Sequence, residues 1–150
     1  MKKKKIGVCT ARGYIAGVNS IIRGLCLAAR AHKADVIGIK DGFDGLLLPK
    51  SSKPGCLELS ADLCENLDFN DNMLGTNPQT DPFRMRSIKD GQVEEIDRSE
   101  ELIDRIKQLE IDTVIVIGGS QSLTTLAKLS KKGLPCICIP LSVEIGRAHV

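Results

Sequence analysis

The chain has 150 residues, of which 42% are hydrophobic and 27% are charged, and its formal net charge is +2. That length corresponds to about one domain and suffices to bury a core, and the composition argues against a disordered chain. The small net charge and the scarcity of aromatic residues, with one Tyr, no Trp and three Phe, argue against a nucleic-acid-binding surface.

The sequence predicts a cytoplasmic protein that does not bind a membrane. The basic start at 2–5 is followed by an apolar stretch too short for a signal peptide, and Arg12 interrupts it. No apolar run approaches the roughly 20 residues of a membrane helix. In a reducing compartment we expect the cysteines to be buried thiols, with a metal or redox role as the alternative. They are Cys9, Cys26, Cys56, Cys64, Cys136 and Cys138.

The first 45 residues predict a strand, a helix and a second strand. Residues 5–10 form a short apolar run typical of a buried strand. A helix follows from Asn19, and Asn19 or Ser20 can cap it. Residues 35–39 predict the second strand, and residues 40–43 have turn chemistry. The apolar residues at helical spacing are Ile21, Ile22, Leu25, Ala28 and Ala29.

Residues 50–98 carry the weakest patterns. We expect a loop at 50–55, a short helix within 57–67, and a strand end with a turn at 73–78. Residues 81–91 are polar and predict a loop. Residues 92–96 fit either a short strand or the approach to the next helix.

The pattern becomes clear again at Asp97. Residues 97–100 have capping-box spacing and precede a helix whose apolar face runs from Leu102 to Leu109. The β-branched run 113–117 predicts a strand buried on both faces. A helix over 120–132 and a buried strand over 135–140 complete the alternation. We therefore predict an α/β fold: a doubly wound parallel sheet with helices on both faces.

Ligands of open α/β sheets bind beyond the carboxyl ends of the strands. The segments that follow a predicted strand are 10–19, 38–43, 118–122 and 140–146. In the third, glycines lead into a helix N-terminus, whose free N–H groups and partial positive charge suit a phosphate. An ordinary strand–helix turn capped by serine explains the same residues equally well. The segment is neither a G-x-G-x-x-G nor a Walker motif.

Several segments also match known motifs in order and spacing. Residues 4–19 are similar to K-I-G-V-L-T-S-G-G-D-A-P-G-M-N, and 22–24 read I-R-G. Residues 39–46 are similar to I-R-D-G-Y-E-G-L, 74–78 to L-G-T-S-R, 116–123 to V-I-G-G-D-G-S-L, and 140–144 to P-x-T-I-D. Together they resemble the N-terminal half of the 6-phosphofructokinase family, over nearly the whole chain.

The resemblance implies a fold of two α/β lobes, of which residues 1–144 would be the N-terminal nucleotide-binding lobe. That lobe holds Mg-ATP, or pyrophosphate in some members. Fructose 6-phosphate lies between the lobes and across a subunit interface, and its 1-hydroxyl receives the phosphoryl group in glycolysis. The resemblance thus implies a nucleotide and a sugar phosphate as ligands, and a homo- or hetero-oligomer at full length.

Site residues follow from the matched positions. The resemblance places catalytic groups at Ser142 and Glu144, and the metal site at Ser120. Basic residues of the family's effector site correspond to Arg23 and Lys40, although Leu27 replaces a second helix arginine. The positions for phosphate or nucleotide are Arg12, Gly13, Gly118, Gly119, Ser120, Gln121 and Ser122.

Departures from the family pattern fall on these working positions. Arg12 replaces a loop glycine and would either pair with phosphate or block it, and Tyr14 replaces the loop Asp. Ser120 replaces the metal-binding Asp, and a neutral hydroxyl is a poor magnesium ligand. Gln121 replaces a residue that is Gly in ATP users and Asp in pyrophosphate users. Pro78 replaces an arginine, for which Arg84 or Arg86 could substitute.

Two functions remain open. Losing a preorganised electrostatic group costs about 10²–10³ in rate, so these changes favour a non-catalytic paralogue that binds nucleotide or assembles with an active subunit. Family membership favours the phosphofructokinase reaction itself. After Glu144 the pattern stops, and we expect 145–150 to be a truncation or foreign tail and the sugar-phosphate lobe to be absent. The chain alone is then expected to have no kinase activity.

Overall fold

The computed structural model describes residues 3–10, 17–47, 55–59, 74 and 81–140. Its centre is a five-stranded sheet in the order β3-β2-β1-β6-β7. Strands β1, β2, β6 and β7 are parallel, and β3 pairs with β2 in the antiparallel sense. The strand bounds are β1 Lys5–Thr10, β2 Asp35–Ile39, β3 Cys56–Glu58, β6 Thr113–Gly118 and β7 Cys136–Pro140.

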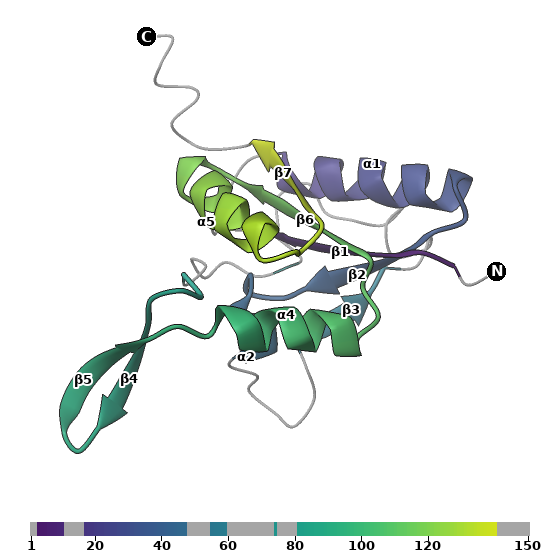
Figure 1. Ribbon diagram of the computed structural model, residues 1–150. Helices are drawn as coiled ribbons and strands as arrows, with labels where there is room; N and C mark the ends of the chain where they lie inside the picture. The colour runs from purple at the N-terminus through teal and green to yellow at the C-terminus, as the bar shows by residue number, and fades with distance from the viewer. Residues whose placement is uncertain (1–2, 11–16, 48–54, 60–73, 75–80, 141–150) are drawn as a thin grey trace, which may run out of the picture.

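Helices cover both faces of this sheet (Figure 1). Helix α1, Val18–Ala31, packs on one face. Helices α2, Asp44–Leu47, α4, Ser99–Gln108, and α5, Ser120–Lys131, contribute to the core on the other. The predicted α/β architecture with a mostly parallel sheet is therefore confirmed.

Strand β6 separates two hydrophobic cores. Val114 and Val116 are buried against α4 and α5, whereas Ile115 and Ile117 are buried against α1. Successive side chains of a strand point to opposite faces, so a strand covered on both faces needs apolar residues at every position. The β-branched run at 113–117 is unbroken because helices cover both faces of β6.

Strand β7 is less buried than predicted. Its residues are half-buried or exposed, and Ile137 is 54% exposed. The reason is its place at the edge of the sheet, where it has a neighbouring strand on one side only. An apolar run alone does not distinguish an edge strand from a central one.

The middle of the chain differs most from expectation. Leu57 and Glu58 belong to β3 and not to a helix, and residues 60–67 of that expected helix lie outside the described residues. The prediction of a loop over 81–91 is wrong at Met85–Lys89, which is strand β4. This strand forms an antiparallel hairpin with β5, Gln92–Ile96. The strand alternative for 92–96 is confirmed.

Four described cysteines are free thiols as predicted, but of these only Cys9 is buried, and Cys56, Cys136 and Cys138 are half-buried. Cys26, on the inner face of α1, is disulfide-bonded, so the expectation of a reduced thiol is wrong there. Pairing depends on how closely the fold brings two sulfur atoms together, which sequence spacing does not show.

Among the described residues, no helix is long and apolar enough to span a membrane.

Candidate functional site

The carboxyl ends of three neighbouring strands meet at one edge of the sheet. Thr10 at the end of β1 is aligned with Ile117 of β6, and Gly118 is aligned with Pro140 at the end of β7. The segments that follow these strands therefore start side by side. Of their predicted site residues, four lie outside the described residues: Arg12, Gly13, Ser142 and Glu144.

The turn from β6 into α5 is the described part of this edge. Gly118 is buried, and Gly119 occupies the N-cap of α5 in an extended conformation with φ −98° and ψ −157°. Within the part of the chain that the structure describes, no side chain caps the helix, and its first turn holds no acidic residue. The capped-turn explanation of this segment therefore lacks its serine cap. The first N–H groups of the helix have no intrahelical acceptor and carry partial positive charge, which suits an anion.

The side chains of this turn are neutral. Ser120 and Gln121 are exposed, while Ser122 is 7% exposed. The Ser120 carbonyl oxygen accepts a hydrogen bond from Thr124 Oγ1 at 3.1 Å. Magnesium prefers carboxylates, and the described residues contain no group of three or more His, Cys, Asp or Glu side chains that could hold a metal ion. The described part of the edge thus fits a phosphate group but not the magnesium ion that the family implies.

The two candidate effector residues lie on different elements. Arg23 is half-buried in α1, and Lys40 is exposed just after β2. The Lys40 backbone N–H donates to the Gly55 carbonyl oxygen at 2.7 Å, so the turn that carries Lys40 is tied to the start of β3. Leu27, at the position of the second helix arginine, is 48% exposed. No contact joins Arg23 to Lys40 among the described residues, so their joint role in an effector site stays a prediction.

The residues proposed as substitutes for the arginine at Pro78 belong to the hairpin. Arg84 lies before β4 and pairs with Glu95 of β5 at 3.4 Å, and Arg86 is exposed in β4. Among the residues that the structure describes, neither arginine has a hydrogen bond or ion pair with the turn between β6 and α5; the contact of Arg84 is with Glu95.

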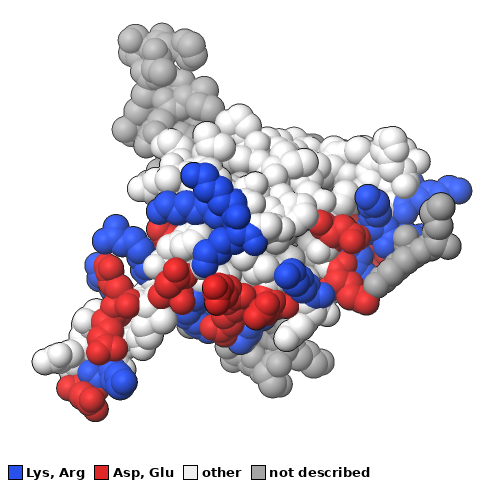
Figure 2. Space-filling view, viewed as in Figure 1, with Lys and Arg blue, Asp and Glu red and all other residues white. Residues whose placement is uncertain are grey.

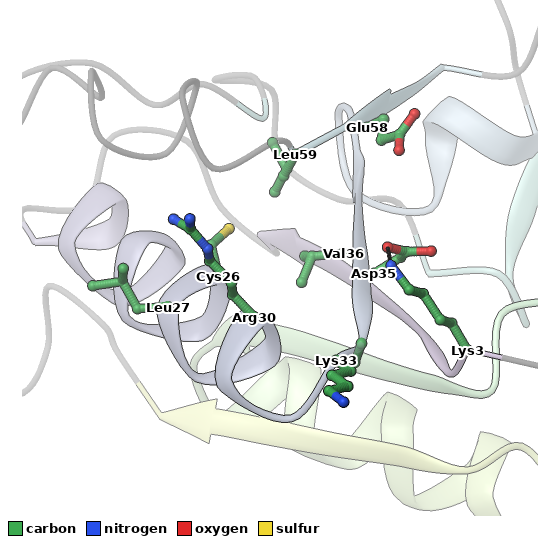
Figure 3. A pocket seen from close by; sticks show the side chains of 10 residues that line it. Lys3, Cys26, Leu27, Arg30, Lys33, Asp35, Val36, Glu58 and Leu59 are labelled. Atoms are coloured by element: carbon green, nitrogen blue, oxygen red, sulfur yellow. Dashed lines mark ion pairs between the residues drawn. The ribbon is translucent and has the colours of Figure 1, made fainter.

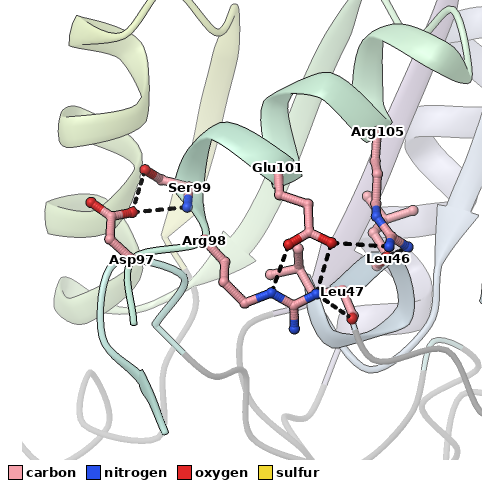
Figure 4. Close-up of polar contacts among 7 residues, drawn as sticks. All are labelled: Leu46, Leu47, Asp97, Arg98, Ser99, Glu101 and Arg105. Carbon is pink, nitrogen blue, oxygen red and sulfur yellow. Dashed lines mark hydrogen bonds and ion pairs between the residues drawn. The ribbon is translucent and has the colours of Figure 1, made fainter. Parts of the chain in front are cut away.

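Helix α4 holds the end of α2 through two arginines (Figure 4). Arg98 Nη2 donates to the Leu47 carbonyl oxygen at 3.0 Å, and Arg105 Nη1 donates to that of Leu46. Glu101 binds Arg98 at 2.7 and 2.8 Å and Arg105 at 3.0 Å. Hydrogen bonding from Arg98 is the largest cause of the lowered pKa of Glu101. The network satisfies carbonyl groups that a helix end leaves without partners.

The start of α4 differs slightly from the predicted capping box. The helix begins at Ser99, and the Asp97 carboxylate accepts hydrogen bonds from the Ser99 N–H at 2.9 Å and from its hydroxyl at 2.6 Å. These bonds lower the pKa of Asp97. Glu100 approaches Lys132 Nζ at 3.9 Å. The predicted capping box over 97–100 is therefore wrong in register: Arg98 occupies the N-cap, and Asp97, one residue before it, accepts from Ser99 and not from Glu100.

A pocket of about 380 Å³ lies at the opposite, amino edge of the sheet, between the end of α1 and the start of β2 (Figure 3). Its charged residues have both signs: Lys3, Arg30, Lys33, Asp35 and Glu58. Lys3 Nζ and Asp35 Oδ1 are 4.0 Å apart. Mixed charges do not select an anion, and the pocket is separate from the carboxyl edge.

The surface charge agrees with the small net charge. On the face in Figure 2, Lys and Arg side chains lie next to Asp and Glu side chains, without a continuous basic surface.

Comparison with known proteins decides the family. The model of the phosphofructokinase family matches residues 5–145. The chain belongs to the phosphofructokinase family. It is 34% identical over 145 residues to a pyrophosphate–fructose 6-phosphate 1-phosphotransferase of Dictyoglomus thermophilum, covering 96% of this chain and 37% of that protein.

A second relative uses the other phosphoryl donor. The chain is 32% identical over 141 residues to the ATP-dependent 6-phosphofructokinase 3 of Bacteroides thetaiotaomicron, covering 93% of this chain and 39% of that protein. The chain therefore spans less than two fifths of the length of these curated relatives. The expected match to an N-terminal half is confirmed.

Solved phosphofructokinases share the fold. The structure of the Pichia pastoris enzyme in the T-state matches with a TM-score of 0.73 and 19% identity over 95% of this chain and 16% of that one. A pyrophosphate-dependent phosphofructokinase of Marinobacter aquaeolei matches with a TM-score of 0.64 and 19% identity over 91% of this chain and 32% of that one. At these identities the likeness shows the fold alone.

Proposed function

We propose that this phosphofructokinase chain is the phosphoryl-donor lobe of a larger enzyme, which transfers a phosphoryl group from ATP or pyrophosphate to the 1-hydroxyl of fructose 6-phosphate. The observation that carries the proposal is the α5 N-terminus, which has no side-chain cap and begins at the carboxyl end of β6. It lies next to the end of β1 and the end of β7. The proposed protein is a cytoplasmic homo- or hetero-oligomer.

Phosphoryl transfer depends mainly on positioning and on stabilising charge at the phosphate oxygens. The first-turn N–H groups of α5 would hold the donor phosphate, with Ser120 and Ser122 as hydroxyl donors, and their fixed dipoles would stabilise charge that develops during transfer. In this proposal Glu144 accepts the proton of the sugar hydroxyl, and Ser142 is the second residue of the transfer site. Arg12 and Gly13 are the proposed phosphate-binding residues that follow β1 in the sequence.

A second function is favoured by two residues of the same turn. Ser120 cannot replace a magnesium-binding carboxylate, and Gln121 fits neither donor class of the family. A phosphofructokinase paralogue that binds nucleotide without transferring phosphate, as a regulatory or assembly subunit, explains both. The proposed roles of this chain's residues therefore do not include holding magnesium.

Calorimetry on the full-length protein separates the two functions. ATP, ADP and pyrophosphate are titrated with and without Mg²⁺, and a coupled assay measures fructose 1,6-bisphosphate formation. Magnesium-dependent donor binding with turnover supports the enzyme. Magnesium-independent nucleotide binding without turnover supports the binding subunit. No binding of any of the three ligands would contradict both.

A further inference from the structure

The β4–β5 hairpin projects from the body of the molecule (Figure 1). Its strands form a sheet of their own and pair with no strand of the central sheet. They are joined by Asp90 and Gly91, whose φ values of 52° and 77° are those of the tight turn that suits a twisted hairpin. An isolated two-stranded hairpin is only marginally stable in water, so its exposed face gains from a partner.

One face of the hairpin is exposed and amphipathic. Ile88 is paired with Val93, and these side chains are 78% and 66% exposed. Arg86 is paired with Glu95 on the same face, since residues two apart share a face. The opposite face is anchored at its base, where Met85 is 4% exposed and belongs to the core.

We propose that this face, defined by Arg86, Ile88, Val93 and Glu95, docks onto the same face of a second copy of the chain. A two-fold axis parallel to the hairpin lays β4 of one copy over β5 of the other. Ile88 then meets the Val93 position of the second copy, and Arg86 meets the Glu95 position. Both contacts occur twice, so apolar groups meet each other and opposite charges meet each other.

The complementarity of charge is what selects a second copy as the occupant. Each copy presents Arg86 on β4 and Glu95 on β5 at the same level, so the surface is complementary to itself. Glu95 also pairs with Arg84 of its own copy at 3.4 Å, but both side chains of that pair are more than half exposed. The face is small beside the roughly 1,200–2,000 Å² buried in stable interfaces. The hairpin contact therefore forms one part of the subunit interface of the full-length protein.

Two charge reversals test the contact on the full-length protein. In Arg86→Glu both copies carry only acidic groups at this level, and in Glu95→Arg only basic ones. Each variant alone is expected to self-associate about tenfold more weakly in sedimentation velocity, because like charges meet. A 1:1 mixture places acidic copies against basic ones and is expected to restore the wild-type association constant.

The mixture distinguishes a contact between copies from a change within one hairpin. The Arg84–Glu95 ion pair within one hairpin is kept in Arg86→Glu and lost in Glu95→Arg, and mixing changes neither, so only an intermolecular contact can recover. Lys89→Glu is the matched control, because it reverses a charge on the opposite face of the hairpin and should leave association unchanged. Ile88→Lys should weaken association without changing the circular dichroism spectrum.

Three results would overturn the proposal. A mixture that associates as weakly as the separate variants would exclude the charge contact between copies. An Ile88→Lys variant with wild-type association would exclude the apolar contact. A wild-type protein that stays monomeric at all concentrations would exclude self-association. None of these results depends on nucleotide binding or turnover, so the proposed function is tested separately.

Discussion

A Cβ atom on Gly45 would stand 2.1 Å from the carbonyl oxygen of Lys40 and 3.0 Å from that of Gly55. These backbone atoms are held in place because the Gly55 N–H donates to the Gly45 carbonyl oxygen at 2.7 Å. We expect Gly45→Ala to destabilise the protein by about 1–3 kcal/mol, the usual cost of overpacking. Urea unfolding of the full-length protein measures it.

Gly24→Ala is the matched control for this substitution. Gly24 lies within α1, and a Cβ atom there would meet nothing within 4 Å. Alanine is favoured over glycine in a helix by up to about 1 kcal/mol, so Gly24→Ala should be neutral or stabilising. Equal destabilisation by both alanines would show that the close approach at Gly45 is unimportant.

Arg98 should matter more to stability than an exposed arginine. Its side chain is 23% exposed and donates to Leu47 as well as to Glu101. Hydrogen bonds that involve charged groups contribute about 1.5–3 kcal/mol, so Arg98→Ala should cost about that much. Arg84→Ala, which removes the exposed pair with Glu95, should cost under about 1 kcal/mol. Equal losses of unfolding free energy would contradict this assignment.

The Glu101 network should weaken in acid. The pKa of Glu101 is lowered in the folded state, so its contribution to stability is present above its unfolded pKa and is lost as pH falls through the folded value. Wild type should exceed Glu101→Gln in unfolding free energy at pH 7, and the difference should shrink below about pH 4. Glu94→Gln, exposed on β5, serves as the control at both pH values. A pH-independent difference for Glu101→Gln would refute the ionic contribution.

Thiol reactivity should follow burial. Burial raises the pKa of the Cys9 thiol to about 12, and it raises the pKa of Cys136 and Cys138 as well. Cys9 is fully buried, whereas the other two are half-buried on β7. Since the thiolate is the reactive form, we expect iodoacetamide at pH 8 to modify Cys136 and Cys138 before Cys9. Peptide mass spectrometry gives the order, and early labelling of Cys9 would contradict it.

Restoring the missing carboxylate tests the role of Ser120. We expect Ser120→Asp to make donor binding depend on Mg²⁺, because it supplies a ligand that magnesium prefers at the start of α5. Ser120→Asn has a similar size without the charge and should not do so. Calorimetry with ATP or pyrophosphate, with and without Mg²⁺, compares the two variants. If donor binding depends on Mg²⁺ equally in both variants, position 120 is not the metal-binding position.

The sequence predicts the elements whose side chains are buried and fails where they are not. Strands β1 and β6 are apolar at their centres, at 6–9 and 114–117, because helices cover both their faces. The hairpin has mostly exposed side chains, so it shows little apolar alternation, and only Asp90-Gly91 signals its turn. The arginine contacts of α4 were missed because their acceptors are backbone carbonyls 51 and 59 positions away.

The candidate site was predictable in kind but not in detail. The sequence predicts a glycine turn before a helix at 118–119, and the structure places this turn beside the ends of β1 and β7. That Gly119, and no serine side chain, occupies the cap of α5 depends on backbone geometry. Residue type alone does not fix that geometry.

The central position of β1 sets the timing of folding. Ile6 pairs with Val36 of β2, but its other neighbour is Thr113 of β6, and the Lys5 N–H bond to Asp112 Oδ2 joins residues 107 positions apart. At about 5–20 residues per second, a ribosome makes that intervening chain in about 5–20 s. Throughout that interval one edge of β1 has no partner strand. During synthesis, β6 must therefore pair with that edge before a strand of another chain does.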